Sequence, residues 1–476
     1  MVSKRSALNH KLGIIICLLF TSLAYSNIFN NDFVIDDYKF IVDWPLIHDL
    51  GNLSQFFGPH NQPQGEEGVY SPLKTLFHAL NHQAWGQKPF GYHLVSIAVH
   101  LLATFFIYRI VLLLRGGEAL AVLTAFIFGL HPVHVDAVTF MTASIDTLGV
   151  LFMFISFYFY IKKDSAGVPK DYALSLFFAL LAIFTHELCI SLPVLFLWYE
   201  LCFQTSGREK LIRKLLPFFG MALVYVLFKF LVLHSVSRGG YLENSFYLNS
   251  LVALKALRLY PLVLFFPFQL AVNRPVAEGI SSVNIEDFSR AAVLSQSFLD
   301  KEVMVSLILL GLAVLGAVRC WKDHRLVSFI IGWLYLSLLP VMNIVAMSSF
   351  FAERYVYPGS FGFAFGAAFY LCRLYENKVT KYLAVFLTIA LLQFYFVRTI
   401  LHNTDFKNEL TFYENEANVN PQSAFLQHDL GVMYLRVPDT DRARQHFEKA
   451  LILFEQQGKA QEIREVEDVL KQLPAQ

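Results

Sequence analysis

The residues with the clearest potential for chemistry are two adjacent carboxylates, Asp36 and Asp37, which closely follow the first apolar segment. Their neighbours Phe33, Val34 and Phe40 are apolar enough to hold the pair at a membrane surface. Such surroundings can shift the pKa of a carboxylate, as a general base requires. Because adjacent residues do not share a face, one should point into a cavity while the other holds the loop or a substrate. The structural alternative is that an aspartate caps the next helix.

A second group of polar residues lies in the short turn between two later apolar segments. His131, His134 and Asp136 fall within six residues, and Asp136 suits the first turn of a helix, where the dipole favours negative charge. Two histidines and one aspartate could form part of a metal site, with His186 or Glu187 as a further ligand. Phosphate contact or turn structure is the preferred interpretation. No cofactor is therefore assigned, and a divalent metal is not favoured.

Asp146 lies inside an apolar segment, about ten residues after its start. Ionisable side chains at such depth are costly and usually line an interior cavity. Thr139 and Thr142 precede it at helical spacing, so the three residues predict one polar stripe. The structural alternative is a hydrogen bond between two membrane helices.

Several basic residues are candidates for binding an anionic headgroup. Arg354 follows Glu353 at the start of a late apolar segment, and arginine forms forked hydrogen bonds to phosphate or carboxylate. The alternative is an interfacial ion pair involving Glu353. Lys229 and Arg258 also lie in apolar segments, and for each the alternative is a basic side chain that extends to the membrane surface.

The composition requires a membrane to position these residues. The chain has 476 residues, of which 56% are hydrophobic and 16% are charged, against about 25% charged in soluble domains. Apolar runs of about 18 residues or more recur, and each indicates a membrane-spanning helix. The net charge of +1 gives no indication of a nucleic-acid partner. All five cysteines lie in or beside apolar segments, which favours membrane-core positions over a disulfide framework: Cys17, Cys189, Cys202, Cys320 and Cys372.

The apolar runs predict an all-α, polytopic membrane bundle of about 11–12 spans. They lie near residues 11–29, 92–114, 118–130, 135–161, 171–185, 188–204, 213–235, 251–272, 302–320, 325–347, 353–373 and 381–401. Charged residues and prolines interrupt the run within 236–300, which favours a re-entrant or interfacial segment there. Broken helices at membrane depth are tolerated where they line a cavity.

The distribution of Lys and Arg predicts the orientation. Basic residues collect before the first span and at every second turn, and such loops stay in the cytoplasm. The N-terminus is therefore expected in the cytoplasm. The loops with Asp36, His131, His186 and Arg354 then share the opposite side. Nearly all of the chemically capable groups are thus expected on one face of the membrane.

The composition changes after residue 401, where polar residues replace the apolar runs. The residues that define the new pattern follow tetratricopeptide-repeat spacing: Leu430, Gly431, Tyr434, Ala443, Phe447 and Ala450. A lone repeat cannot bury enough apolar surface, so the tail is expected to dock on the membrane domain or on a partner. We therefore divide the chain into a membrane domain, 1–401, with a long first extracytoplasmic loop at 30–90, and an extracytoplasmic helical tail, 402–476.

These stretches together resemble the transmembrane-and-tetratricopeptide-repeat O-mannosyltransferases, a family of C-type (GT-C) membrane glycosyltransferases. The resemblance covers about residues 26–200 and 340–455. The stretches that carry it are Asp32 to Asp37, Tyr70 to Leu73, Gly91 to His100, His131 to Val138, Phe184 to Glu187, and Glu353-Arg354-Tyr355-Val356-Tyr357. The sequence departs from the family at Ser71, where Arg is common, and at Thr185-His186, which replace Ser-Lys. The short tail favours a bacterial member in an inner membrane.

The resemblance implies an inverting GT-C enzyme that transfers a mannose-like hexose from a polyprenyl-phosphate donor to a hydroxyl of a protein or glycan outside the cytoplasm. Asp36 would be the base and Asp37 would orient the loop or acceptor. The partners would be the lipid-linked donor, the acceptor and membrane lipids. The expected donor-phosphate and substrate-binding residues are Lys74, His131, His134, Asp136, Asp146, His186, Glu187, Lys229, Glu353, Arg354 and Tyr355. The alternative is a non-catalytic scaffold that assembles an envelope complex through its tail.

Overall fold

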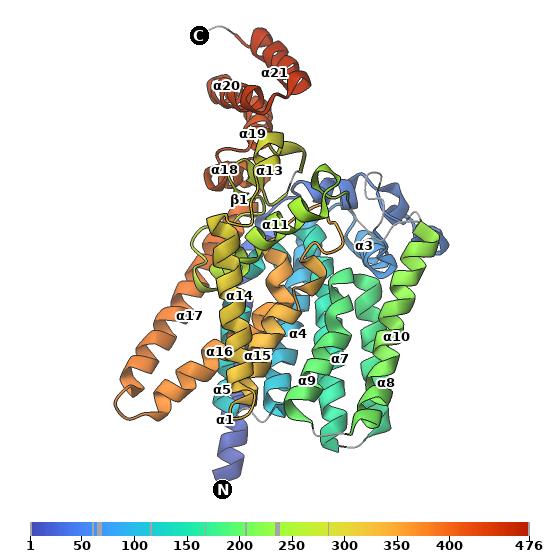
Figure 1. The fold of residues 1–476 in the computed structure, drawn as a ribbon, viewed down its shortest axis with the longest axis vertical. Coiled ribbons are helices and arrows are strands. Elements are labelled where there is room, and N and C mark those ends of the chain that lie inside the picture. Colours follow the sequence, from blue (N-terminus) through green and yellow to red (C-terminus); the bar gives the residue numbers. More distant parts are fainter. Residues whose placement is uncertain are drawn as a thin grey trace.

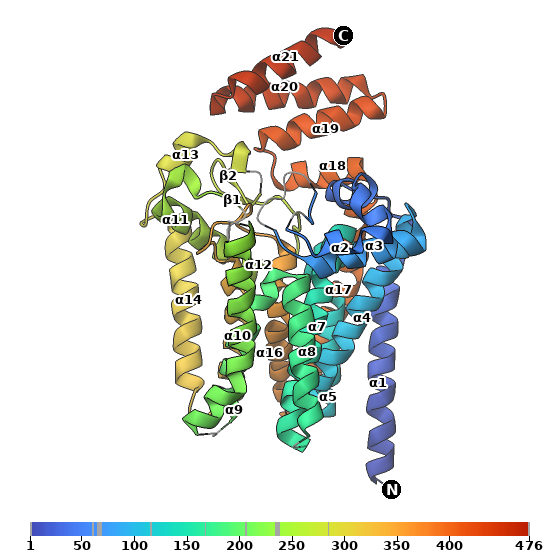
Figure 2. The same cartoon turned by 90° about the vertical axis from the view of Figure 1, so that its right-hand side faces the viewer.

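The structure is a computed structural model that describes residues 2–59, 61–63, 69–114, 117–166, 168–204, 207–233, 239–283 and 285–474. Long helices run side by side to form a bundle, and the two chain ends lie at opposite ends of the molecule (Figures 1 and 2). In the described part of the chain, strands occur only in a two-stranded antiparallel hairpin, β1 (Pro275–Ala277) and β2 (Ile280–Ser281). The predicted all-α class is confirmed.

Every predicted apolar segment of the bundle contains a helix. The bundle helices are α1 (Val2–Tyr25), α4 (Pro89–Leu113), α5 (Glu118–Leu130), α7 (Met141–Ala166), α8 (Pro169–Thr185), α9 (Leu192–Phe203), α10 (Arg208–Leu233), α14 (Lys301–Cys320), α15 (Arg325–Leu336), α16 (Tyr357–Glu376) and α17 (Lys381–Asn403). Within the described ranges, seven helices are long and apolar enough to cross a membrane, or eight if one bent pair is counted. The chain is therefore a multi-pass membrane protein.

The predicted span at 135–161 starts later than expected. The chain forms a short helix, α6 (Val135–Val138), and α7 begins only at Met141. Asp146 consequently lies in the second turn of α7 and not ten residues into a span. This shift places the carboxylate near the end of the bundle that carries the tail.

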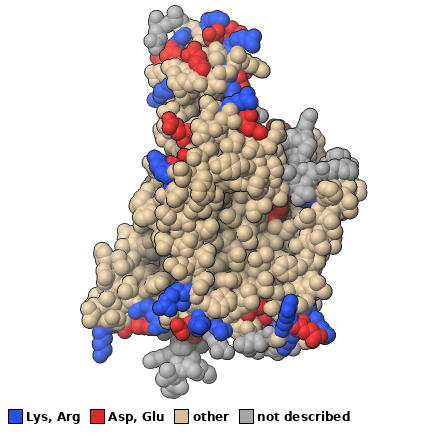
Figure 3. Space-filling model, in the orientation of Figure 1, with Lys and Arg blue, Asp and Glu red and all other residues tan. Residues whose placement is uncertain are grey.

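The bundle surface separates charged ends from an apolar middle. Figure 3 shows Lys, Arg, Asp and Glu gathered at the end farthest from the tail and again on the tail, with few charges between them. Large apolar side chains in this middle zone are exposed, among them Phe230 on α10, Leu315 on α14 and Phe386 on α17. Surrounding lipid explains this exposure, because helices that face hydrocarbon carry apolar side chains outward.

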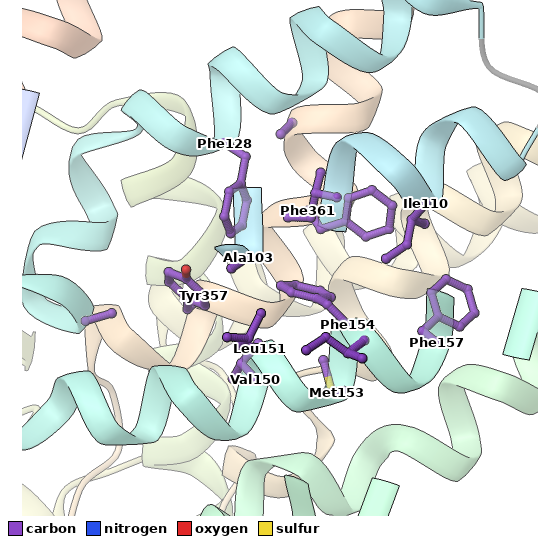
Figure 4. Packing of buried hydrophobic residues seen from close by; sticks show 14 of the residues in the cluster. Ala103, Ile110, Phe128, Val150, Leu151, Met153, Phe154, Phe157, Tyr357 and Phe361 are labelled. Atoms are coloured by element: carbon purple, nitrogen blue, oxygen red, sulfur yellow. The ribbon is translucent and has the colours of Figure 1, made fainter. Parts of the chain in front are cut away.

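Aromatic rings fill the centre of the bundle. Phe128, Phe154 and Phe361 from α5, α7 and α16 are fully buried, and the Phe154 ring contacts each of the other two (Figure 4). Helices α15 and α16 approach closely at Gly362, where a Cβ atom would lie 2.8 Å from the carbonyl oxygen of Ile330. This packing fixes the positions of α7 and α16, whose ends carry the candidate site.

One end of the bundle is covered by the first loop and by the region around 246–294. The loop contains α2 (Leu53–Phe56) and α3 (Pro72–Trp85), and the later region contains α11 (Phe246–Leu257), α12 (Leu259–Phe265) and α13 (Arg290–Leu294). Both views place α11 at this end (Figures 1 and 2). Although Phe246–Phe265 is apolar enough to span, α11 and α12 meet at Arg258. The Arg258 side chain donates to the carbonyl oxygen of Val276 at 2.9 Å, so it anchors the hairpin. Whether Arg258 also contacts phosphate stays a prediction.

The tail consists of α18 (Glu409–Val419), α19 (Ala424–Arg436), α20 (Thr440–Gln457) and α21 (Ala460–Gln472). Gly431 allows α19 and α20 to approach, since a Cβ atom there would lie 3.0 Å from the Phe447 ring. The tail docks on the membrane domain. For example, Asn415 donates to the carbonyl oxygen of Leu270 at 3.0 Å, and the backbone of Asp32 donates to that of Lys407 at 2.9 Å.

Candidate functional site

Asp37 attaches the first loop to the start of α7. Its side chain is fully buried. One carboxylate oxygen accepts from the backbone N–H and hydroxyl of Thr142 at 2.8 and 2.7 Å, and the other accepts from the N–H of Val34 at 3.1 Å. Burial raises the pKa of Asp37 to about 7, although these three hydrogen bonds act in the opposite direction. Asp37 is therefore the member of the pair that holds the loop.

Asp36 is half-buried and lies beside a strained residue. Ile35 has a φ angle of +45°, a left-handed conformation that is costly for a β-branched side chain. Asp36 is within electrostatic range of Asp37 and Arg354. The strained turn thus gives the two adjacent carboxylates different surroundings, as their positions in the sequence predicted.

Three of the predicted residues form a charged cluster near the same end of the bundle. Asp146 on α7 accepts from Lys74 Nζ, at the start of α3, at 2.8 Å. Its same oxygen lies 3.5 Å from His186 Nε2, just after α8. All three side chains are at most 14% exposed. Residues more than a hundred positions apart are therefore brought together at one point.

Arg354 adjoins this cluster from the opposite side. Its Nη1 lies 3.3 and 3.5 Å from the two oxygens of Asp136, whose Oδ2 also accepts from the Arg354 backbone N–H at 2.9 Å. Arg354 lines a small cavity with Asp146, His186 and Tyr355. Since a guanidinium carries five N–H donors, the side chain can bind an anion while it remains paired with Asp136.

A larger groove continues from this small cavity. It has an open volume of about 890 Å³, and His186 and Tyr355 line both spaces. Lys229 and Glu187 form an ion pair of 2.9 Å at its edge, and Lys229 is only 3% exposed. The remaining lining is largely apolar and comes mainly from α10 and from the segment 339–347, together with Leu188 and Ile190. A charged pocket thus leads into an apolar groove.

Three predicted substrate-binding residues point to protein partners instead. The Nε2 atom of His131 lies 3.0 Å from the carbonyl oxygen of Leu264, and that of His134 lies 2.8 Å from the Ser360 hydroxyl. The carboxylate of Glu353 accepts from the backbone N–H of Ala271 at 2.9 Å. These side chains are buried and connect elements, because a buried polar group must find a partner. Among the described residues, no group of three or more His, Cys, Asp or Glu is placed to hold a metal ion.

The predicted polar stripe on α7 serves several elements instead of one cavity. Thr139, just before the helix, donates to Asn403 at 2.8 Å, Thr142 donates to Asp37, and Asp146 faces the charged cluster. The groove segment 339–347 could not be predicted, because its residues are mostly apolar and their spacing indicates only a continued span. Only the folded chain brings that segment opposite α10.

A further cavity lies between the first loop and the tail. Its open volume is about 890 Å³. The loop contributes Asp32, Phe33 and Tyr38, and the tail contributes Met433 and Arg436. The loop residues that line this cavity lie within a few positions of Asp36 in the sequence.

Comparisons with known proteins agree with the motif resemblance. A family model described as dolichyl-phosphate-mannose-protein mannosyltransferase matches residues 70–233. The protein O-mannosyl-transferase F38B6.6 of Caenorhabditis elegans is 24% identical over 441 residues, covering 88% of this chain and 59% of that protein. Human protein O-mannosyl-transferase TMTC3 is 22% identical over 450 residues, covering 88% and 49%. Mouse TMTC2 is 31% identical over 148 residues, covering 30% and 18%.

Among solved structures, an oligosaccharyltransferase of Archaeoglobus fulgidus matches with a TM-score of 0.46 and 10% identity, covering 88% of this chain and 58% of that chain. The chain spans 49–59% of the length of the two curated relatives that match along most of it. The resemblance to the O-mannosyltransferases is confirmed by the family model and these relatives.

Proposed function

We propose that this protein is a membrane glycosyltransferase that transfers a hexose from a polyprenyl-phosphate donor to a hydroxyl group of a protein or glycan. The observation that carries the proposal is the cavity lined by Asp146, His186 and Arg354. It opens into an apolar groove and lies within electrostatic range of Asp36. Phosphate chemistry needs fixed cationic donors, whereas a polyprenyl chain needs an apolar path. The arrangement of cavity and groove suits such a donor.

The donor phosphate would bind between Arg354 and Lys229. Arg354 offers a forked set of donors, and Lys229 adds a charge at the mouth of the groove. Lys74 and His186 would complete the pocket, with Asp146 holding both in place. The polyprenyl chain would follow the apolar groove towards the lipid. This binding would orient the anomeric carbon towards the first loop.

Asp36 would act as the general base. It would take the proton of the acceptor hydroxyl while the acceptor oxygen forms a bond to the anomeric carbon. The bond between that carbon and the phosphate oxygen would break, and its electron pair would leave with polyprenyl phosphate. Arg354 and Lys229 would stabilise the negative charge of this leaving group. Attack on the face opposite the phosphate inverts the anomeric configuration.

The acceptor would approach through the cavity between the first loop and the tail. This cavity presents Tyr38 and Phe33 on one wall and residues of α19 on the other. The tail would thus help to hold a protein or glycan acceptor beside the catalytic loop. We place this face outside the cytoplasm, since basic residues gather at the opposite end of the bundle (Figure 3). The membrane would be a bacterial inner membrane.

The proposal is tested with membranes that contain this protein and radiolabelled polyprenyl-phosphate hexoses. The expected result is transfer of label to a protein or glycan and a loss of at least about a hundredfold in Asp36→Asn, since positioned bases contribute about 10²–10⁴. Asp43→Asn is the matched control, because Asp43 lies in the same loop and is exposed. Equal transfer by Asp36→Asn and the parent protein would contradict the assignment of the base.

The non-catalytic scaffold remains the second candidate, supported by the docked tail. A scaffold should tolerate Asp36→Asn and should lose function when the tail is removed. If no hexose donor supports transfer while Asp36→Asn rescues the defects of a deletion strain, the protein acts as a scaffold.

A further inference from the structure

Three consecutive backbone amides between α12 and β1 are held by two carboxylates from distant parts of the chain. Glu353 accepts from the N–H of Ala271 at 2.9 Å. Glu416, on α18 in the tail, accepts from the N–H groups of Val272 and Asn273 at 2.9 and 2.6 Å, one with each oxygen. The segment 271–273 therefore connects the tail directly to the residue that precedes Arg354.

Both carboxylates are enclosed. Glu353 and Glu416 are each 1% exposed, and they lie within electrostatic range of each other. Arg274 lies 3.5 Å from Glu353, and His402 lies 3.6 Å from it on the other side. A buried N–H donor that is left without a partner is costly. Movement of either carboxylate would therefore disturb the whole segment.

Apolar packing makes the segment and the Arg354 motif one unit. Leu270 and Val276 lie on either side of the three amides, and they belong to the same buried cluster as Tyr355 and Val356. Glu353 and Arg354 are successive residues of one short helical turn, Glu353–Val356. A displacement of Glu353 would thus be passed to Arg354 and to its pair with Asp136.

We propose that Glu416 is a positioning residue, through which the docked tail sets Arg354 in the donor-phosphate pocket. The inference rests on the proposed function for the identity of the ligand, but not on turnover. When α18 is docked, Glu416 holds segment 271–273 against Glu353, and Arg354 is fixed at the cavity. When α18 moves away, the amides lose their partners and the anion-binding group loses its support.

The test measures binding of polyprenyl phosphate to the purified full-length protein, so that it does not depend on transfer. Glu416→Ala removes the acceptor of the amides of Val272 and Asn273 and is expected to weaken binding of polyprenyl phosphate about tenfold. A change of this size corresponds to the contribution of about one hydrogen bond. Glu416→Gln keeps one acceptor oxygen and should give a smaller loss. Hydrogen exchange at residues 271–273 should be slowest in the parent protein, faster in Glu416→Gln and fastest in Glu416→Ala.

Glu414→Ala is the matched control. Glu414 lies on the same helix, but its carboxylate accepts from the Tyr434 hydroxyl at 2.6 Å, within the tail. It should leave the affinity and the exchange at 271–273 unchanged. Faster exchange in Glu416→Ala with unchanged affinity would overturn the inference, as would an equal loss in Glu414→Ala. Absence of hexose transfer in a parent protein that binds polyprenyl phosphate would contradict the proposed function alone.

Discussion

At the scale of single residues, each basic group of the candidate site is already paired with an acid. Lys74 pairs with Asp146, Lys229 with Glu187, and Arg354 with Asp136. A phosphate must therefore share these cations with fixed carboxylates. An arginine can do so more easily than a lysine, because its donors point in several directions.

Arg354→Lys tests this difference, since it keeps the charge and removes the forked donors. We expect weaker binding of the donor by about 1.5–3 kcal/mol, the usual value of one charged hydrogen bond. The donor concentration at half-maximal transfer measures this effect. Arg373→Lys is the control, because Arg373 lies exposed at the other end of α16. Equal donor affinity in both variants would contradict the assigned role.

Asp37 gives a second prediction at this scale. Thr142→Val removes the hydroxyl that donates to Asp37 at 2.7 Å and leaves a buried carboxylate oxygen with one donor fewer. We expect a loss of about 1–3 kcal/mol in stability, measured as thermal unfolding in detergent. Thr388→Val should change it little, because that hydroxyl donates only within its own helix, to Ala384. Equal stabilities would show that Asp37 does not hold the loop.

At the scale of elements, the positions of α16 and α18 decide how the site is assembled. Helix α16 starts at the Arg354 turn and packs against α15 through Gly362. Helix α18 follows α17 and presents Glu416 to segment 271–273. The turn that precedes α16 carries Arg354, the proposed anion-binding residue, and α18 helps to fix this turn from outside the membrane bundle.

Gly362→Ala tests the contact between α15 and α16. The new methyl group would lie 2.8 Å from the Ile330 carbonyl oxygen, so the helices must separate. Overpacking of this kind costs about 1–3 kcal/mol, which thermal unfolding would measure. Gly220→Ala is the control within a helix, because nothing lies within 4 Å of its added carbon. It should be neutral or stabilising, since alanine favours helices.

Docking of α18 should depend on pH. Burial raises the pKa of Glu416 from 4.5 to about 8. The hydrogen bonds from Asn273 and Val272 oppose this shift, and nearby Glu353 and Asp136 add to it. A raised pKa favours the protonated, docked form. Docking is therefore strongest below about pH 4.5 and weakens as the pH rises towards 8.

The expected outcome is faster hydrogen exchange at residues 271–273 at pH 8 than at pH 5, after correction for the intrinsic pH dependence of exchange. Glu416→Gln cannot ionise and should lose this dependence. Docking of α18 that strengthens as the pH rises in the parent protein would contradict the predicted direction of this pH dependence.

At the scale of the whole molecule, the first loop, the region 246–294 and the tail gather at one end (Figures 1 and 2). Charged turns lie at the other end, with an apolar zone between them (Figure 3). The candidate site lies where the bundle meets this cap. A lipid-linked donor and a water-soluble acceptor could therefore reach the same residues from different phases.

This arrangement predicts opposite membrane sides for two positions. A single labelling tag after Thr440, in the tail, should be accessible from outside intact cells. A tag after Lys322, between α14 and α15, should be accessible only after permeabilisation. An impermeant reagent measures both. Labelling of Lys322 but not of Thr440 from outside would invert the proposed topology and remove the proposed site from the outer face.

The amino-acid sequence alone is enough to predict the helical membrane fold, because runs of apolar residues long enough to span lipid leave the backbone no other way to satisfy its polar groups. It also identified Asp146, His186 and Arg354 as candidates, since ionisable residues within or beside apolar segments are rare and costly, whereas Lys74 was expected at the site only from the motif resemblance. These four meet in the structure.

Which polar residues face a cavity and which face a protein partner could be seen only in the folded chain. His131, Glu353 and Asp136 have the same residue types as the cavity residues, but their partners are a carbonyl of Leu264, an amide of Ala271 and the Arg354 side chain. Residue type and spacing specify a polar group and its helix face, whereas its partner depends on contacts between segments that are 82 to 218 residues apart in these three cases. The role of Glu416 is of the same kind, because it arises only where the tail folds back onto segment 271–273.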